Sequence, residues 1–161
     1  MSSVPGTSVA PEPVVVTAAP RKAAIVRIEA PAAALGETIA AAMSEVVRAI
    51  ALNSLFPTGS PFTHYLSSGG EMVVAEVGFP VSGRLVASGR VTEGELPGGT
   101  IASGFHLGPY ETIGETYRRI ESWILQRGNV PATTMWEVYL RGPGQETDPA
   151  RWRTEIFWPF S

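Results

Sequence analysis

Glutamate and tyrosine alternate with apolar residues near position 137, in a segment whose residue types could do chemistry. The segment reads Trp136-Glu137-Val138-Tyr139-Leu140, and this alternation is typical of a β-strand, in which successive side chains point to opposite faces. We expect the apolar set to meet helices and Glu137 and Tyr139 to share the other face. A carboxylate among aromatic rings can pair with an organic cation or accept a proton as a general base.

A second alternating segment, Arg153 to Trp158, behaves in the same way. Alternation predicts that Thr154, Ile156 and Trp158 turn towards the helices and that Glu155 and Phe157 do not. By the same argument Tyr65 and Glu76, from the N-terminal half, join the open face. A solvated glutamate or an ordinary cross-strand tyrosine pair would explain each residue alone. Their coincidence on one face instead favours a groove with the following residues: Tyr65, Glu76, Glu137, Tyr139, Glu155 and Phe157.

The two histidines are further candidates. Alternation places His64 on the helix side, where a buried, hydrogen-bonded ring is expected rather than a ligand contact. His106 precedes Gly108-Pro109 at the mouth of the groove, where it and Tyr110 are candidate ligand contacts. We expect no metal and no cofactor, because two histidines and no cysteine leave few ligands for a zinc site.

An internal repeat predicts the elements that position these residues. Three segments of the N-terminal half match three of the C-terminal half in the same order: Leu35–Ile39 with Ile113–Tyr117, Tyr65-Leu66 with Tyr139-Leu140, and Ala75–Pro80 with Thr154–Pro159. Each half has a stripe of apolar residues at helical spacing, running from Leu35 to Ile50 and from Ile113 to Ile124.

Each half therefore reads as a β-α-β-β unit. Strands are expected over residues 23–29, 62–66 and 72–79, and over 100–106, 135–140 and 152–158, with a further strand within 84–96. The fold class is α+β, with pseudo-two-fold symmetry, both helices on one face of an antiparallel sheet and a ligand groove on the other. We expect one domain over residues 22–160, with repeats at 22–82 and 98–160, after a flexible tail at 1–21.

Composition excludes several classes of partner. The net charge of −3 argues against a protein that binds nucleic acid by neutralising phosphates. No apolar run is long enough for a membrane span, so no membrane partner is expected. The absence of cysteine excludes disulfides and fits a cytoplasmic protein.

The second half also resembles a known family. The stretch Phe105–Tyr110, the segment Trp136–Leu140, and the later Thr147-Asp148-Pro149 and Thr154-Glu155-Ile156 are similar to the signature of GyrI-like (gyrase-inhibitor-like) domains. The resemblance implies a duplicated β-α-β-β fold. It also implies kinship with drug-sensing effector domains of transcription activators, a stand-alone gyrase inhibitor, and hydrolases of cyclopropane-bearing alkylating toxins.

In the drug-sensing members a glutamate in an aromatic cleft contacts the cation, and Glu137 matches that residue, with Tyr139 beside it. Thr63 stands where the repeat would place a second such glutamate. The resemblance implies a stand-alone binder of lipophilic aromatic cations, able to bind or sequester several drugs. Two alternatives stay open. One is a hydrolase in which Glu137 or Glu155 activates water and Tyr139 supports an oxyanion; the other is a module for a protein partner, such as a gyrase modulator.

Overall fold

The computed structural model describes residues 11–67 and 70–161, which form one antiparallel sheet and two helices. The strands are β1 (Val14–Ala18), β2 (Arg21–Pro31), β3 (Phe62–Ser67), β4 (Met72–Pro80), β5 (Thr92–Leu96), β6 (Gly99–Leu107), β7 (Met135–Arg141) and β8 (Arg153–Pro159). The helices are α1 (Leu35–Leu52) and α2 (Ile113–Gln126), with short 3-10 turns η1 (Ala32–Ala34), η2 (Tyr110–Thr112) and η3 (Pro149–Arg151). The predicted α+β class, both helices and the predicted strands are confirmed, each to within about two residues at its ends.

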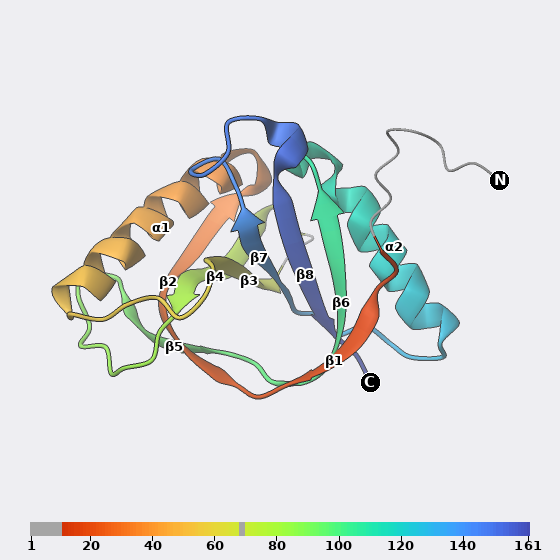
Figure 1. Ribbon diagram of the computed structural model, residues 1–161, viewed down its shortest axis with the longest axis horizontal. Coiled ribbons are helices and arrows are strands. Elements are labelled where there is room, and N and C mark those ends of the chain that lie inside the picture. The colour runs from red at the N-terminus through yellow and green to blue at the C-terminus, as the bar shows by residue number, and fades with distance from the viewer. Residues whose placement is uncertain (1–10, 68–69) are drawn as a thin grey trace.

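The strand order shows the internal duplication directly. The sheet runs β1-β6-β8-β7-β3-β4-β2-β5, so β6-β8-β7 of the second half mirrors β2-β4-β3 of the first. The halves meet where β3 pairs with β7, and Thr63 lies directly opposite Glu137 in that register. The pseudo-two-fold axis therefore passes between the two central strands (Figure 1).

The edge strands are exchanged between the halves. β1 precedes the first unit but pairs with β6 of the second, and β5 precedes the second unit but pairs with β2 of the first. β5 confirms the strand expected within residues 84–96. β1 corrects the tail expected at residues 1–21: its run of valines extends the sheet through backbone hydrogen bonds to β6, so this stretch is ordered. Residues 1–10 of that tail lie outside the described residues.

Two apolar cores hold the helices on one side of the sheet. Under α1, Val46 and Ile50 pack against strand residues such as Val26 and Val77. Under α2, Ile120 and Ile124 pack on Ala102, Ile156 and Trp158. Gly104 on β6 allows this approach, because a Cβ there would lie 2.8 Å from the Ile120 side chain. Figure 1 shows α1 and α2 on opposite flanks, with β7 and β8 between them.

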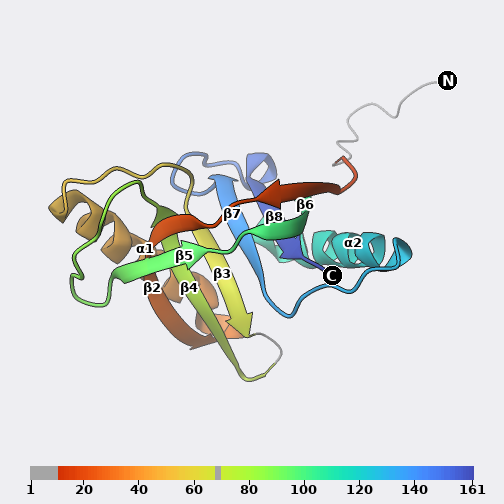
Figure 2. The same ribbon diagram turned by 90° about the horizontal axis from the view of Figure 1, so that it is seen from below.

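A third core fills the face that the helices do not cover. It contains Ala23, Ile25, Phe62, Leu96, Ile101 and Trp136, with Val138 and Phe157 packed against it. The chain from β1 into β2 and the chain from β5 into β6 run across this side (Figure 2). The sheet is therefore buried on both faces over part of its area. Neither α1 nor α2 has the length and hydrophobicity that a membrane-spanning helix needs, and no other helix in the described part of the chain does.

Candidate functional site

A cleft of about 980 Å³ opens between α1 and the centre of the sheet. One wall is the apolar side of α1, with Leu35, Ile39, Ala40, Met43 and Val47. The floor carries Tyr65, Phe79, Glu137 and Tyr139, and the rim carries Tyr110, Ile113 and the loop from Gly142 to Gln145. The cleft thus joins elements from both halves of the chain.

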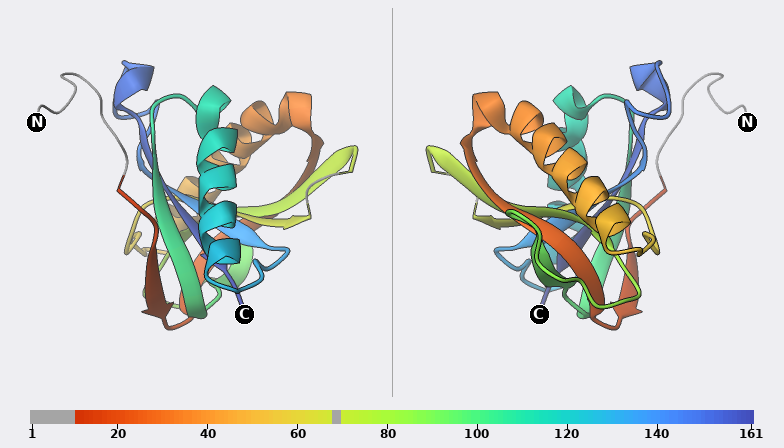
Figure 3. Two further views of the ribbon diagram at one scale, coloured as in Figure 1. Left: turned by 90° about the vertical axis from the view of Figure 1, so that its right-hand side faces the viewer. Right: turned by 90° about the vertical axis from the view of Figure 1, so that its left-hand side faces the viewer.

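The cleft that contains Glu137 lies on the face that carries the helices, whereas we expected Glu137 on the opposite face. The reason is the spacing of the helices. α1 packs on β2 and β4, and α2 packs on β6, so the two helices cover strands on either side of the central pair β3 and β7. Figure 3 shows the molecule first from the side of α2 and then from the side of α1. The pseudo-two-fold axis therefore runs through a hollow instead of through packed helices.

Glu137 lies at the base of this cleft and is only 6% exposed. Its Oε1 accepts hydrogen bonds from the hydroxyls of Tyr139, at 2.8 Å, and Tyr65, at 3.2 Å. Its Oε2 accepts a hydrogen bond from the hydroxyl of Tyr117 on α2. Three phenol donors from three different elements therefore converge on one carboxylate.

The electrostatics of Glu137 are a balance of opposing effects. Burial raises its pKa, because a carboxylate loses hydration, while the three tyrosine hydroxyls favour the ionised form and act against that rise. Burial and the nearby carboxylate also raise the pKa of Tyr65, Tyr117 and Tyr139, so these phenols keep their protons and act as donors. Among the described residues, no lysine or arginine forms an ion pair with Glu137.

Thr63 extends this network across the pseudo-two-fold axis. Its Oγ1 lies 2.8 Å from the Tyr139 hydroxyl, which also lies 2.8 Å from Glu137 Oε1. A phenol has a single proton, so Tyr139 donates to the carboxylate and accepts from Thr63. The position where the repeat would place a second glutamate therefore holds a neutral residue that supports the first.

Tyr110 lines the cleft, as expected, and His106 does not. The Tyr110 ring packs edge-on to Tyr139, with centroids 5.9 Å apart, and lies 5.1 Å from the ring of Trp152. His106 is buried; its Nε2 donates to the Pro109 carbonyl at 2.8 Å, and its Nδ1 shares a hydrogen bond with the Thr116 hydroxyl at 2.7 Å. This histidine fixes the backbone that leads into Tyr110.

Three residues expected in the same groove lie on the other face of the sheet. The β7–β8 register pairs Trp136 with Phe157 and Val138 with Glu155, so Glu155 and Phe157 point away from Glu137. The expectation that Trp136, Val138 and Leu140 meet the helices is also wrong. In β8 the expectation is confirmed, because Ile156 and Trp158 pack under α2. In β7 both sets of side chains meet apolar neighbours, so hydrophobicity did not identify the helix side of that strand.

Glu76 is also on the far face, as the cross-strand partner of His64. His64 is buried as expected but away from the helices, with its Nδ1 3.6 Å from Glu76 and its ring edge-on to Trp136. Neither ring nitrogen has a hydrogen-bond partner among the described residues.

Sequence reasoning missed Tyr117 as a site residue and treated it only as part of a helical stripe. The repeat contains a usable signal, because Tyr117 aligns with Ile39 of the first half. A hydroxyl on an otherwise apolar stripe needs a buried partner, and Glu137 is that partner. No group of three or more metal-ligating side chains occurs within residues 11–67 and 70–161.

Solved structures similar to this chain have low sequence identity. EcmrR in complex with DNA is 20% identical, with a TM-score of 0.81 over 93% of this chain and 57% of that chain; its C-terminal domain alone is 18% identical, with a TM-score of 0.82 over 93% and 97%. This chain therefore spans little more than half of the EcmrR chain.

A hydrolase from Listeria innocua is 11% identical, with a TM-score of 0.67 over 93% of this chain and 92% of that chain. SAV2435 bound to tetraphenylphosphonium is 12% identical, with a TM-score of 0.61 over 93% and 94%. At these identities the likeness establishes the fold.

The sequence itself identifies the family. No curated protein matches the chain, but residues 11–161 match the family described as the GyrI-like small molecule binding domain. That match includes β1, the two halves and the strand that carries Glu137. The chain therefore belongs to the GyrI-like family of small-molecule-binding domains.

Proposed function

We propose that the cleft binds lipophilic aromatic cations, with Glu137 as their counter-charge. One observation carries this proposal: the Glu137 carboxylate is almost fully buried at the base of the cleft and has three phenol donors but, among the described residues, no cationic partner. A buried carboxylate without a cation is disfavoured as an anion. A ligand that brings a positive charge removes that penalty.

The surroundings of Glu137 favour organic cations over small hydrated ions. The α1 wall is aliphatic and the floor carries the aromatic rings of Tyr65, Phe79 and Tyr139, so a ligand must lose much of its hydration on entry. A delocalised cation with aryl groups loses little hydration energy, and each contact with a tyrosine face is worth about 0.5–2 kcal/mol. A volume of about 980 Å³ accommodates several aryl rings and sets loose demands on shape, so we expect several such cations to bind.

A structural relative supports the same ligand class. SAV2435, which shares the fold, was solved with tetraphenylphosphonium. That compound has a delocalised positive charge surrounded by four phenyl rings. It is the natural first probe for this cleft.

The direct experiment is a calorimetric titration of the protein with tetraphenylphosphonium and with triphenylphosphine oxide, a neutral aryl counterpart. The proposal predicts one saturable site and at least about tenfold tighter binding of the cation. Equal affinity for both compounds would mean that the cleft recognises apolar surface alone. That result, or no saturable binding, would overturn the proposal.

A second candidate, hydrolysis of a strained electrophile, is favoured by the tyrosines beside Glu137. A carboxylate whose pKa is raised is a better base. Glu137 would accept a proton from water as the water oxygen bonds to a cyclopropane carbon and the ring C–C bond breaks. The released electron pair would pass to a conjugated carbonyl oxygen, which a tyrosine hydroxyl stabilises by a hydrogen bond. Glu137 would then return its proton to the opened product, which restores the carboxylate. Incubation with a cyclopropane-bearing alkylator and mass spectrometry separates the two functions: accumulation of a water adduct with repeated turnover favours the hydrolase, and recovery of the unchanged compound excludes it.

A further inference from the structure

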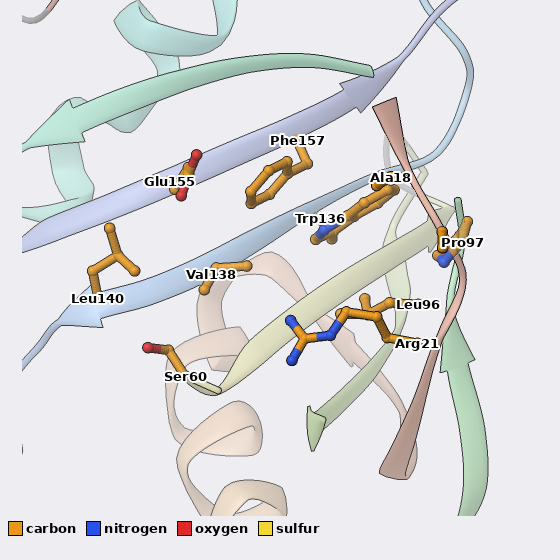
Figure 4. Close-up of a pocket in the computed structure, with 11 residues that line it drawn as sticks. Ala18, Arg21, Ser60, Leu96, Pro97, Trp136, Val138, Leu140, Glu155 and Phe157 are labelled. Carbon is orange, nitrogen blue, oxygen red and sulfur yellow. The ribbon is translucent and has the colours of Figure 1, made fainter. Parts of the chain in front are cut away.

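A second hollow lies on the opposite face of the sheet from the Glu137 cleft, with a volume of about 300 Å³. Its floor comprises Trp136 and Val138 of β7 and Phe157 of β8 (Figure 4). The walls come from the β1–β2 connection at Ala18 and the β5–β6 connection at Leu96-Pro97. These are the two chain segments that cross this side of the molecule, so the exchange of edge strands creates the hollow.

The floor of this hollow is aromatic and apolar. The rings of Trp136 and Phe157 are stacked, with centroids 5.6 Å apart and planes 17° from parallel. Trp136 is held by the apolar core beneath it, while Phe157 stays partly exposed. A planar ring can pack against the exposed part of Phe157 at small entropic cost, because the stack on Trp136 already holds that ring in place.

One acid and one base flank this floor. Ser103 donates a hydrogen bond to Glu155 Oε2 at 2.7 Å; Oε1 has no partner among the described residues. Arg21 donates only long hydrogen bonds through Nη2 to Thr58, at 3.3 and 3.4 Å, which leaves most of its five donors available. Arg21 and Glu155 form no ion pair with each other within the described residues, and Figure 4 shows them on opposite sides of the aromatic floor.

We propose that this hollow is a second binding site, for a small planar aromatic acid that carries a hydrogen-bond donor at the end opposite its carboxylate. Arg21 pairs with the carboxylate, the ring packs against Phe157 beside the edge of Trp136, and Glu155 accepts the hydrogen bond from the donor. Guanidinium and carboxylate match in geometry as well as in charge. The volume of this hollow, about 300 Å³, is at the lower end for ligand pockets, so the ligand can have only one or two rings. The site does not depend on the function proposed for the cleft.

The probe for this site is 4-aminobenzoate, and the readout is the NMR shift of the Trp136 indole N–H during titration. Benzoate lacks the donor and aniline lacks the carboxylate. We expect saturable binding of 4-aminobenzoate and about tenfold weaker binding of each analogue. The Trp123 indole, on α2, provides an internal control and should not shift. An unmoved Trp136 signal, or equal affinity for all three compounds, would overturn the proposal.

Two substitutions separate recognition from folding. Arg21→Gln, at an exposed position, should weaken 4-aminobenzoate and benzoate about tenfold and leave aniline unchanged. Glu155→Gln should weaken the binding of 4-aminobenzoate, while the affinity for benzoate should stay at the wild-type value. Saturating tetraphenylphosphonium should not displace 4-aminobenzoate, because the two sites lie on opposite faces. Displacement would place 4-aminobenzoate in the cleft and refute a second site, as would an Arg21→Gln variant that binds all three compounds like the wild type.

Discussion

The two halves of the chain have the same β-α-β-β unit but contribute opposite chemistry to the cleft. The second half contributes Tyr117, Glu137 and Tyr139. The first half has Ile39 at the position of Tyr117 and Thr63 at that of Glu137, whereas Tyr65 repeats Tyr139. One half therefore makes the apolar wall and the other makes the charged end. Duplication supplies the scaffold, and substitutions at two repeated positions give the cleft its polarity.

The register of the central strands explains why a single glutamate is preferred. Thr63 and Glu137 are direct cross-strand partners, so a symmetric pair of glutamates would place two carboxylates beside each other in a buried site. Such a pair cannot both ionise without a large penalty. A threonine in the first half avoids this repulsion and adds a hydrogen bond to Tyr139.

Replacing Thr63 with the glutamate that the repeat would place there should have the largest effect on stability. Thr63→Glu places a second, fully buried carboxylate opposite Glu137, and we expect it to lower the free energy of unfolding at neutral pH by about 3–5 kcal/mol. Because burial and the neighbouring charge raise the pKa of the added group, the lost stability should return as the pH falls through that raised pKa. Urea denaturation at several pH values measures this.

Thr63→Val is the uncharged control, since valine has nearly the size of the native threonine but cannot form its hydrogen bond. It should cost only about 1 kcal/mol through the lost hydrogen bond to Tyr139. If Thr63→Glu is as stable as Thr63→Val at neutral pH, positions 63 and 137 do not face each other in a buried site, and this explanation of the asymmetry is wrong.

Removing the charge of Glu137 should have the next largest effect, on ligand binding. Glu137→Gln should weaken tetraphenylphosphonium binding at least about 30-fold, because a desolvated cation then lacks its counter-charge. Triphenylphosphine oxide should bind wild type and variant alike. Calorimetry of both compounds checks this, and a variant that keeps wild-type affinity for the cation would show that the aromatic walls alone bind it.

A smaller effect is expected from the tyrosine that sequence reasoning missed. Tyr117→Phe removes the donor to Glu137 Oε2, so the pKa of Glu137 should rise further and cation affinity at neutral pH should fall about three- to tenfold. Tyr110→Phe is the control, because the Tyr110 ring lines the same cleft and its hydroxyl donates no hydrogen bond to Glu137. Equal losses in both variants would assign the effect to the cleft wall instead of to the carboxylate.

Much of this asymmetry was predictable from the sequence. The internal repeat identified the duplicated unit, and the alternation around position 137 correctly grouped Glu137, Tyr139 and Tyr65 on one face. The repeat also marked Thr63 as the counterpart of Glu137. These features depend on local periodicity, which the sequence shows directly.

The side of the sheet on which the cleft lies was not predictable from the same periodicity, although the helix side of β8 was predicted correctly. Alternation says which residues share a face but not which face meets the helices, and here Trp136 faces a core of its own. That core exists because β1 and β5 exchange partners, a long-range pairing without a local signal. The same register separates Glu155 and Phe157 from the cleft and places them in the second hollow.

The most direct test of the account is an NMR titration of the Glu137 side-chain carboxyl carbon, with and without tetraphenylphosphonium. In the free protein the account predicts a pKa above the ordinary glutamate value, because burial outweighs the three tyrosine hydrogen bonds. With the cation bound, the pKa should fall, since a nearby positive charge favours the ionised carboxylate. A carboxyl that titrates at the ordinary glutamate value, and whose titration does not change when the cation is added, would contradict the central claim.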